Sequence, residues 1–221
     1  MAKTILTPQQ SHFLELAGNN QGIRKLFYLT GGTALAEFYL HHRLSEDIDL
    51  FNEEYEVDPI LIRAFLKKIS PNLSIIDIQE SNFLGLFSFI LTFQNKTTLK
   101  VDFNYYPFPR IQKGKKAFNL EIDSLRDIAT NKIHTLFMKP RSRDYIDLYF
   151  IFKTQPYSLD ALILDAKAKF DWHIDPLTLS SQFLRAKDLT EFPKMLVPFD
   201  RTKMEEFYLK LARELGSKIL K

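Results

Sequence analysis

The chain contains no cysteine among its 221 residues. This absence excludes a disulfide framework, a thiolate metal site and a cysteine nucleophile. No apolar stretch approaches the roughly 20 residues that a membrane-spanning helix needs. The first eight residues also lack the long apolar core of a signal peptide. We therefore expect a soluble, cytoplasmic protein without a membrane partner.

Neither sign of charge dominates the composition, since 30 Lys and Arg residues stand against 27 Asp and Glu residues, a net charge of +3. So small an excess does not by itself indicate a nucleic-acid partner. Hydrophobic residues make up 45% of the chain and include 20 phenylalanines, which is enough for a packed core and argues against disorder. The length allows one sizeable domain or two small ones that share an interface.

Histidine is also scarce, with five residues in the chain. His41 and His42 are adjacent, so on a helix they point in different directions, and no HExxH pattern supports zinc. No Gly-Lys-Ser/Thr follows the glycine pair at residues 31–32, which excludes a P-loop. We identify no Ser-His-Asp arrangement in the sequence.

The most informative stretch is residues 27–51. Residues 27–30 form a short apolar run that predicts a buried strand. Gly31 and Gly32 break this run, and Thr33 can cap a helix over residues 34–40. A glycine pair lets backbone N–H groups approach an anion closely, and the positive end of a helix favours phosphate.

Residues 47–51, Asp-Ile-Asp-Leu-Phe, predict a second strand with Asp47 and Asp49 on one face. Two neighbouring carboxylates repel each other, so a site that keeps both needs a cation between them. Oxygen ligands of this kind suit Mg²⁺, which usually shares its coordination sphere with water and phosphates. A glycine pair alone is more often a plain turn. An Asp-x-Asp motif alone is more often part of a solvated strand face. Together, in one compact unit, they indicate a phosphate cradle facing a metal-binding carboxylate pair.

The remaining pattern mixes strands and helices. In the strand expected over residues 98–106, alternation places Lys100 and Asp102 on one face. Prolines, Gly114 and a run of lysines mark a linker over residues 107–116. We expect helices over residues 7–22, 59–71, 124–138, 142–152, 159–170 and 203–221, a short one between 171 and 198, and further strands over 74–78 and 84–93.

Two blocks of residues carry a family resemblance. The first is Gly31-Gly32-Thr33 followed by Arg43-x-Ser45-x-Asp47-x-Asp49-Leu50-Phe51, and the second is Lys132 followed by residues 139–149, Lys-Pro-Arg-Ser-Arg-Asp-Tyr-Ile-Asp-Leu-Tyr. These blocks resemble the AbiEii-type nucleotidyltransferase toxins, a branch of the DNA polymerase β-like nucleotidyltransferase superfamily. The resemblance implies an α+β fold with a nucleotidyltransferase core, a mixed sheet with flanking helices, over residues 1–112. It implies a mainly helical domain over residues 113–221 that completes the active site.

The resemblance also implies roles for individual residues. Mg²⁺, with Mn²⁺ as an alternative, would be held by Asp47, Asp49 and Asp102. The implied catalytic residues are Asp49, Lys132, Asp147 and Asp102, with Asp102 or Asp147 as the base toward the acceptor hydroxyl. The implied nucleotide-binding residues are Gly31, Gly32, Thr33, Arg43, Ser45, Lys132, Arg141 and Arg143. The family's usual arginine before the turn is Lys139 here, which leaves the role of that position open.

The residues themselves leave plainer alternatives open. Asp102 could be an ordinary surface aspartate on an edge strand. Arg143 and Asp147 are four apart and could form an intrahelical ion pair beside a solvated basic turn, which would contribute only ~0.5 kcal/mol.

The resemblance finally implies an activity. An NTP would donate its nucleoside monophosphate to RNA, with the 3′ end of tRNA as the candidate acceptor, and pyrophosphate would leave. Such a toxin would arrest growth or defend against phage, and a cognate antitoxin would restrain it. Two alternatives stay open: an enzyme of the same fold that modifies a protein or a small molecule, and a non-catalytic module that binds a nucleotide or a partner.

Overall fold

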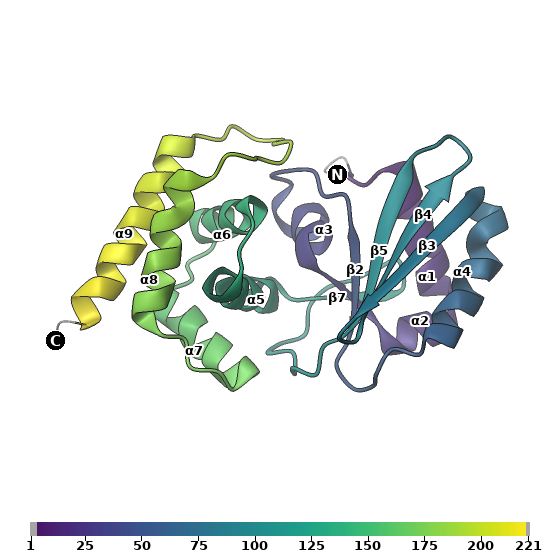
Figure 1. Cartoon of the computed structure of the whole chain (residues 1–221), viewed down its shortest axis with the longest axis horizontal. Coiled ribbons are helices and arrows are strands. Elements are labelled where there is room, and N and C mark those ends of the chain that lie inside the picture. Colours follow the sequence, from purple (N-terminus) through teal and green to yellow (C-terminus); the bar gives the residue numbers. More distant parts are fainter. Residues whose placement is uncertain (1–3, 220–221) are drawn as a thin grey trace. The chain divides into compact units, whose positions relative to one another are not determined.

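Figure 1 shows the computed structural model of the chain, which describes residues 4–219 and side chains up to Ser217. The last two residues of the helix expected over 203–221 lie outside the described residues. The chain forms two compact units. The first, called the sheet unit, contains the described residues up to Tyr39, Leu44–Pro109 and Lys113–Ser124. The second, called the helical unit, contains Leu40–Arg43, Arg110–Gln112 and the described residues from Leu125 onward.

The strands of residues 4–219 form one seven-stranded sheet in the order β3-β4-β5-β2-β1-β7-β6. Strand β1 runs parallel to β7, and β2 runs parallel to β5, while the other neighbours are antiparallel. The mixed sheet confirms the predicted α+β fold class. The strands are β1 (Tyr28–Thr30), β2 (Ile48–Asn52), β3 (Ile75–Phe83), β4 (Leu86–Phe93), β5 (Thr98–Tyr105), β6 (Lys116–Ala117) and β7 (Leu120–Ile122).

Three helices, α1 (Pro8–Asn19), α2 (Gln21–Leu26) and α4 (Pro59–Leu73), lie on one side of the sheet. Aromatic rings fill the space between them and the strands. Phe13 and Phe65 meet edge to face with 5.9 Å between ring centroids, and Phe103 is fully buried with Phe27 at 5.2 Å. Burying each such ring contributes about 2 kcal/mol or more, so the phenylalanine-rich composition supplies this core.

The short helix α3 (Gly31–Leu35) lies on the other side of the sheet and continues as a π-helical turn, η1 (Ala36–Leu40). The prediction that Thr33 caps a helix beginning at residue 34 was wrong, because the helix begins at Gly31 and Thr30 occupies its N-cap position. The Thr33 hydroxyl instead donates a hydrogen bond to the carbonyl oxygen of Asp47. This bond attaches α3 to the residue that precedes β2.

The helical unit contains α5 (Leu125–Met138), α6 (Ser142–Thr154), α7 (Leu159–Phe170), α8 (Pro176–Leu184), the 3₁₀ turn η2 (Arg185–Asp188) and α9 (Arg201–Ile219). Tyr145 and Tyr208 pack edge to face at 5.2 Å and are buried. The Tyr208 hydroxyl donates to the carbonyl oxygen of Tyr145 at 2.6 Å, which satisfies the buried polar group. No helix within residues 4–219 combines the length and the apolar character needed to cross a membrane.

The division into units differs from the predicted boundary after residue 112. Residues 116–122 form a hairpin, and its strand β7 pairs with β1, so the sheet unit continues to Ser124. Residues 110–112 group with the helical unit because Asp127 holds them. Its carboxylate accepts hydrogen bonds from the backbone N–H groups of Ile111 at 2.7 Å and Gln112 at 3.2 Å. Lys169 balances this buried charge at 2.8 Å.

Candidate active site

The carboxylate of Asp49 lies directly against the glycine turn. Gly31 has φ of 73°, in the left-handed region that side chains disfavour. A Cβ atom on Gly31 would lie 2.1 Å from Oδ2 of Asp49. Glycine is therefore required here for its backbone conformation and for the space that the Asp49 carboxylate occupies. The register between β1 and β2 pairs Thr30 with Asp49, which places the Asp49 side chain beside Gly31.

Asp102 stands beside Asp49 on the neighbouring strand. The parallel register of β2 and β5 pairs the two residues directly, so their side chains share a face of the sheet. Strand β5 lies between β4 and β2, and Asp102 is only 7% exposed. The alternative that Asp102 is a surface residue on an edge strand was therefore wrong.

The two oxygens of Asp102 differ in their contacts. Oδ2 accepts a hydrogen bond from Nζ of Lys100. Oδ1 is buried and has no hydrogen-bond partner among the described residues. An unsatisfied buried oxygen of this kind costs about 1–3 kcal/mol, and such groups in native proteins call for an explanation such as an ion or a ligand.

Asp47 completes the carboxylate set. It directly precedes β2, is half-buried, and has its backbone held by Thr33. Within residues 4–219, no three His, Asp or Glu side chains are gathered closely enough to hold a metal ion in the present geometry. The donor chemistry nevertheless fits a hard divalent cation, because Asp47, Asp49 and Asp102 offer only carboxylate oxygens and, within the described part of the chain, Oδ1 of Asp102 lacks a partner. Asp47, Asp49 and Asp102 are the residues that would hold such an ion.

Asp123, just after β7, supports the glycine turn from the other side. Its buried carboxylate accepts a hydrogen bond from the Thr30 hydroxyl at 2.6 Å, and its carbonyl oxygen accepts one from the Tyr39 hydroxyl at 2.8 Å. The backbone N–H of Asp123 donates to the carbonyl oxygen of Leu29 at 2.8 Å. Asp123 therefore fixes the two residues before Gly31 and, through Tyr39, the η1 turn that follows α3. No local pattern in the sequence reveals a pairing between positions 30 and 123, so Asp123 is not among the predicted site residues.

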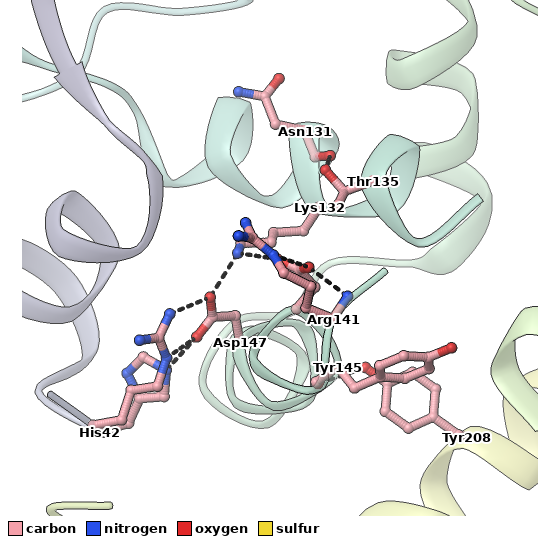
Figure 2. A network of polar contacts seen from close by, with 10 residues as sticks. His42, Asn131, Lys132, Thr135, Arg141, Tyr145, Asp147 and Tyr208 are labelled. Atoms are coloured by element: carbon pink, nitrogen blue, oxygen red, sulfur yellow. Dashed lines mark hydrogen bonds and ion pairs between the residues drawn. The ribbon is translucent and has the colours of Figure 1, made fainter. Parts of the chain in front are cut away.

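The second block of family residues forms a buried ion-pair cluster in the helical unit (Figure 2). Nζ of Lys132 on α5 lies 2.6 Å from Oδ1 of Asp144 and 2.7 Å from Oδ2 of Asp147, both on α6. Arg43 meets Asp147 with two of its three guanidinium nitrogens, Nε to Oδ1 at 2.6 Å and Nη2 to Oδ2 at 2.8 Å. Nε2 of His42 lies 2.8 Å from Oδ1 of Asp147.

The electrostatics of this cluster keep its carboxylates charged. Burial would raise the pKa of Asp147, but the positive charges of Lys132 and Arg43 outweigh it and hold that pKa well below its usual range. Burial would likewise lower the pKa of Lys132, but Asp147 and Asp144 raise it overall. Burial lowers the pKa of His42, so this residue is neutral and donates its Nε2–H to Asp147. Two cations therefore balance two carboxylates in the interior.

The structure thus brings the predicted site residues together in two groups. Gly31, Asp49 and Asp102 meet in the sheet unit, while Arg43, Lys132 and Asp147 meet in the helical unit. Two further predicted site residues, Ser45 and Arg141, make hydrogen bonds through their backbone atoms. Ser45 accepts a hydrogen bond from the Gln10 side chain at 2.8 Å through its carbonyl oxygen, and the backbone N–H of Arg141 donates to Oδ2 of Asp144 at 2.9 Å.

Other predicted residues stand at the margin of the helical cluster. The Arg141 side chain is 67% exposed, and the side chain of Arg143 is half-buried. Gly32 is the second residue of α3. The contact of His42 with Asp147 was not predicted, because the sequence raised His42 only as a zinc ligand. Its position next to Arg43 in the family block is the one signal that could have indicated this contact.

Comparisons with known proteins identify the family of the chain. The family model described as "Nucleotidyl transferase AbiEii toxin, Type IV TA system" matches residues 16–213. The Aquifex aeolicus protein aq_aa25 is 29% identical over 159 residues, which cover 67% of this chain and 68% of that protein.

Solved structures show the same fold. A Helicobacter pylori protein assigned as a nucleotidyltransferase superposes with a TM-score of 0.64 at 20% identity, covering 96% of this chain and 97% of its own. The protein JHP933 from Helicobacter pylori gives a TM-score of 0.62 at 20% identity and covers 95% and 90% of the two chains. Because the family model spans most of the sequence, the chain belongs to the AbiEii nucleotidyltransferase toxins of type IV toxin–antitoxin systems, and it is a nucleotidyltransferase.

Proposed function

We propose that the protein transfers a nucleoside monophosphate from an NTP to an RNA acceptor, with Mg²⁺ held by Asp47, Asp49 and Asp102. The observation that carries the proposal is the pairing of Asp49 with Asp102 beside Gly31, with Oδ1 of Asp102 buried and without a hydrogen-bond partner in the part of the chain that the structure describes. When bound, the divalent ion would neutralise charge that develops on the reacting phosphate.

The transfer itself needs a nucleophile and a leaving group. The acceptor hydroxyl oxygen forms a bond to the α-phosphorus, the bond from that phosphorus to the oxygen bridging it to the β-phosphate breaks, and pyrophosphate leaves. The hydroxyl proton goes to a base. Asp102 suits this role better than Asp147, because Oδ1 of Asp102 is unsatisfied while Asp147 is held by Lys132, Arg43 and His42. A carboxylate whose pKa is held so low is a weak proton acceptor.

Family membership supports a phosphate role for Lys132. An ammonium group has three N–H donors. Among the described residues, Lys132 uses two of these donors, one on Asp144 and one on Asp147. The third donor is therefore left for a phosphate oxygen. We assign Asp147 to positioning Lys132, because this buried carboxylate fixes the Nζ atom.

The acceptor class rests on family membership and on the basic turn before α6. Lys139, Arg141 and Arg143 lie within five positions, and the Arg141 side chain is largely exposed. Basic side chains of this kind bind the phosphates of RNA without reading its sequence. We take the 3′ end of tRNA as the first acceptor to test, and an antitoxin as the restraint on the activity in the cell.

The test is incubation of the purified protein with each α-labelled NTP, Mg²⁺ and total tRNA, followed by separation of RNA, protein and small molecules. Label on RNA supports the proposal. Label on protein or on a small molecule would show that the protein transfers nucleotides but that its acceptor is not RNA. Tight NTP binding without transfer to any fraction would reduce the site to a nucleotide-binding module.

A further inference from the structure

The turn between β3 and β4 presents two apolar side chains to solvent. Phe83 is 72% exposed and Leu84 is 87% exposed, and Leu84 and Gly85 are the two residues that connect the strands. Both have positive φ, 46° for Leu84 and 80° for Gly85, as a type I′ turn requires. Asparagine or glycine suits the first of these positions better, because an apolar side chain with a Cβ is strained in the left-handed region. Folding alone therefore disfavours a leucine at position 84, and the strain points to a contact outside the chain.

A cavity of about 570 Å³ opens beside this turn. Its lining includes Leu84, the aromatic residues Phe83, Phe87 and Tyr105, and the acidic residue Glu56. Glu56 forms no hydrogen bond or ion pair with any other described residue. Aromatic rings and an unpaired carboxylate together suit an organic cation, which they bind through cation–π and charge-assisted contacts.

The charge around the cavity has one sign. Residues 53–58 read Glu-Glu-Tyr-Glu-Val-Asp, with four carboxylates and no Lys or Arg. No Lys or Arg belongs to the described residues that line the cavity. Arg63 of α4 is already bound to Glu80 of β3 at 2.8 Å. The charge therefore favours a basic occupant and disfavours RNA, whose phosphates these carboxylates repel.

The cavity faces away from the candidate carboxylates of the active site. Tyr105 lies three positions after Asp102 on β5, and an odd spacing along a strand places two side chains on opposite faces. Pro59, the first residue of α4, also lines the cavity, which places it on the side of the sheet that α4 covers (Figure 1). An occupant of the cavity therefore leaves the face that carries Asp102 open.

We propose that the β3–β4 turn and this cavity form a docking surface for a basic polypeptide, which places an arginine side chain against Glu56 and covers Leu84 with an apolar neighbour. The exposed Phe83 and Leu84 favour a polypeptide over a small cation, because a free cation has no apolar surface that would cover them. Arginine is the cation that protein interfaces and aromatic rings use most often. The inference does not depend on the proposed metal or acceptor.

The experiment is an NMR titration of the isotope-labelled full chain with a capped pentapeptide, Gly-Leu-Arg-Leu-Gly, and with its citrulline counterpart, which carries a neutral group of the same shape. The arginine peptide should shift the amide signals of Leu84 and Gly85, and the citrulline peptide should bind about fivefold more weakly. Glu56→Gln should abolish this difference. Glu15→Gln, which neutralises an exposed glutamate of α1, is the matched control and should preserve it.

Leu84→Asn separates docking from folding, because asparagine is favoured in the left-handed region. This variant should unfold at a higher temperature than the wild type and bind the arginine peptide about fivefold or more weakly, since an apolar contact is lost. Nucleotidyl transfer should be unchanged. A lower unfolding temperature in Leu84→Asn would show that the leucine serves the fold and would overturn its role in docking.

Three results of the titration would also overturn the proposal: no shift of these signals up to about 10 mM peptide, equal affinity for the two peptides, or an undiminished preference for arginine in Glu56→Gln. Spermidine that binds more tightly than the arginine peptide would make the occupant a small cation. A wild-type dimer in sedimentation that Leu84→Asn dissociates would make it a second copy of the chain. Each of these two results would overturn the basic polypeptide as the partner, and none would change the proposed function.

Discussion

Arg43 and Asp147 meet through two parallel contacts, Nε to Oδ1 at 2.6 Å and Nη2 to Oδ2 at 2.8 Å, although 104 positions separate them in the chain. Both side chains are almost completely buried. Arg63 and Glu80 form a pair with the same two-contact geometry at 2.8 Å each, but the Arg63 side chain is 56% exposed. The two pairs therefore separate the effect of burial from that of geometry.

We expect Arg43→Lys to lower the free energy of unfolding by about 2–4 kcal/mol, because a lysine cannot make both contacts and leaves a buried carboxylate partly unpaired. Arg63→Lys, the matched control, should leave the midpoint of urea unfolding nearly unchanged. Urea titration followed by circular dichroism measures both. Equal losses in the two variants would show that burial of the Arg43–Asp147 pair does not matter.

The pKa of His42 predicts a loss of stability on mild acidification. Burial lowers this pKa below 6.5, so the unfolded chain takes up a proton at a higher pH than the folded chain does. The contribution of His42 is therefore complete above about pH 7.5 and is lost as the pH falls through 6.5. It amounts to about 1.4 kcal/mol for each unit by which the two pKa values differ.

Unfolding free energies measured between pH 7.5 and 5.5 test this expectation. His42→Gln, which keeps a donor for Asp147, should flatten the pH dependence, and His12→Gln, which replaces an exposed histidine of α1, should not. Below about pH 5, protonation of Asp147 and Asp144 should add a further loss, because their pKa values are lowered in the folded state. A His42→Gln profile identical to that of the wild type would contradict the assignment of a neutral, buried His42.

Gly31→Ala should disable the site more than it disturbs the fold. The new Cβ would overlap the Asp49 carboxylate and would force a side chain into the left-handed region, a cost of about 1–3 kcal/mol. We expect nucleotidyl transfer to fall by about 100-fold or more, since a displacement of about 1 Å can cost that much.

The control is Gly216→Ala, because Gly216 lies in α9 and nothing within 4 Å opposes its Cβ. This change should stabilise the helix by roughly 0.5–1 kcal/mol and leave transfer unchanged. Transfer by Gly31→Ala at the wild-type rate would show that the Asp49 carboxylate does not need its present position.

Asp102→Asn should lower the transfer activity while leaving the free energy of unfolding nearly unchanged. The change removes a buried charge whose Oδ1 has no partner among the described residues, so in metal-free buffer the free energy of unfolding should stay within about 1 kcal/mol of the wild type. Transfer should fall by about 100-fold or more, because the proposed base and metal ligand is lost. A variant that loses stability and activity together would indicate a structural role for Asp102.

The fold could largely be predicted from local patterns. The sequence predicted strands over residues 84–93 and 98–106, which are β4 and β5, and helices that begin at residues 142 and 159, as α6 and α7 do. The pattern failed where tertiary contacts decide the outcome. Helix α4 continues past Pro71 to Leu73, which is buried.

The candidate site was predictable only in part, for a related reason. Asp47 and Asp49 lie two apart, so alternation along one strand places them on one face. The pairing of Asp49 with Asp102 depends instead on the order of strands in the sheet, which periodicity does not encode. The family resemblance provided that link. It did not indicate His42 or Lys100, because neither belongs to the residues that carry the resemblance.

We expect the Asp49 carboxylate, which lies beside the glycine turn, to take part in nucleotidyl transfer. The decisive experiment follows label from α-labelled NTP to RNA, with Mg²⁺, for the wild type, Asp49→Asn and Asp77→Asn, the last of which changes an exposed carboxylate of β3. Asp49→Asn should stay folded and transfer label only at background, while Asp77→Asn should match the wild type. Full transfer by folded Asp49→Asn would show that the Asp49 carboxylate takes no part in the reaction.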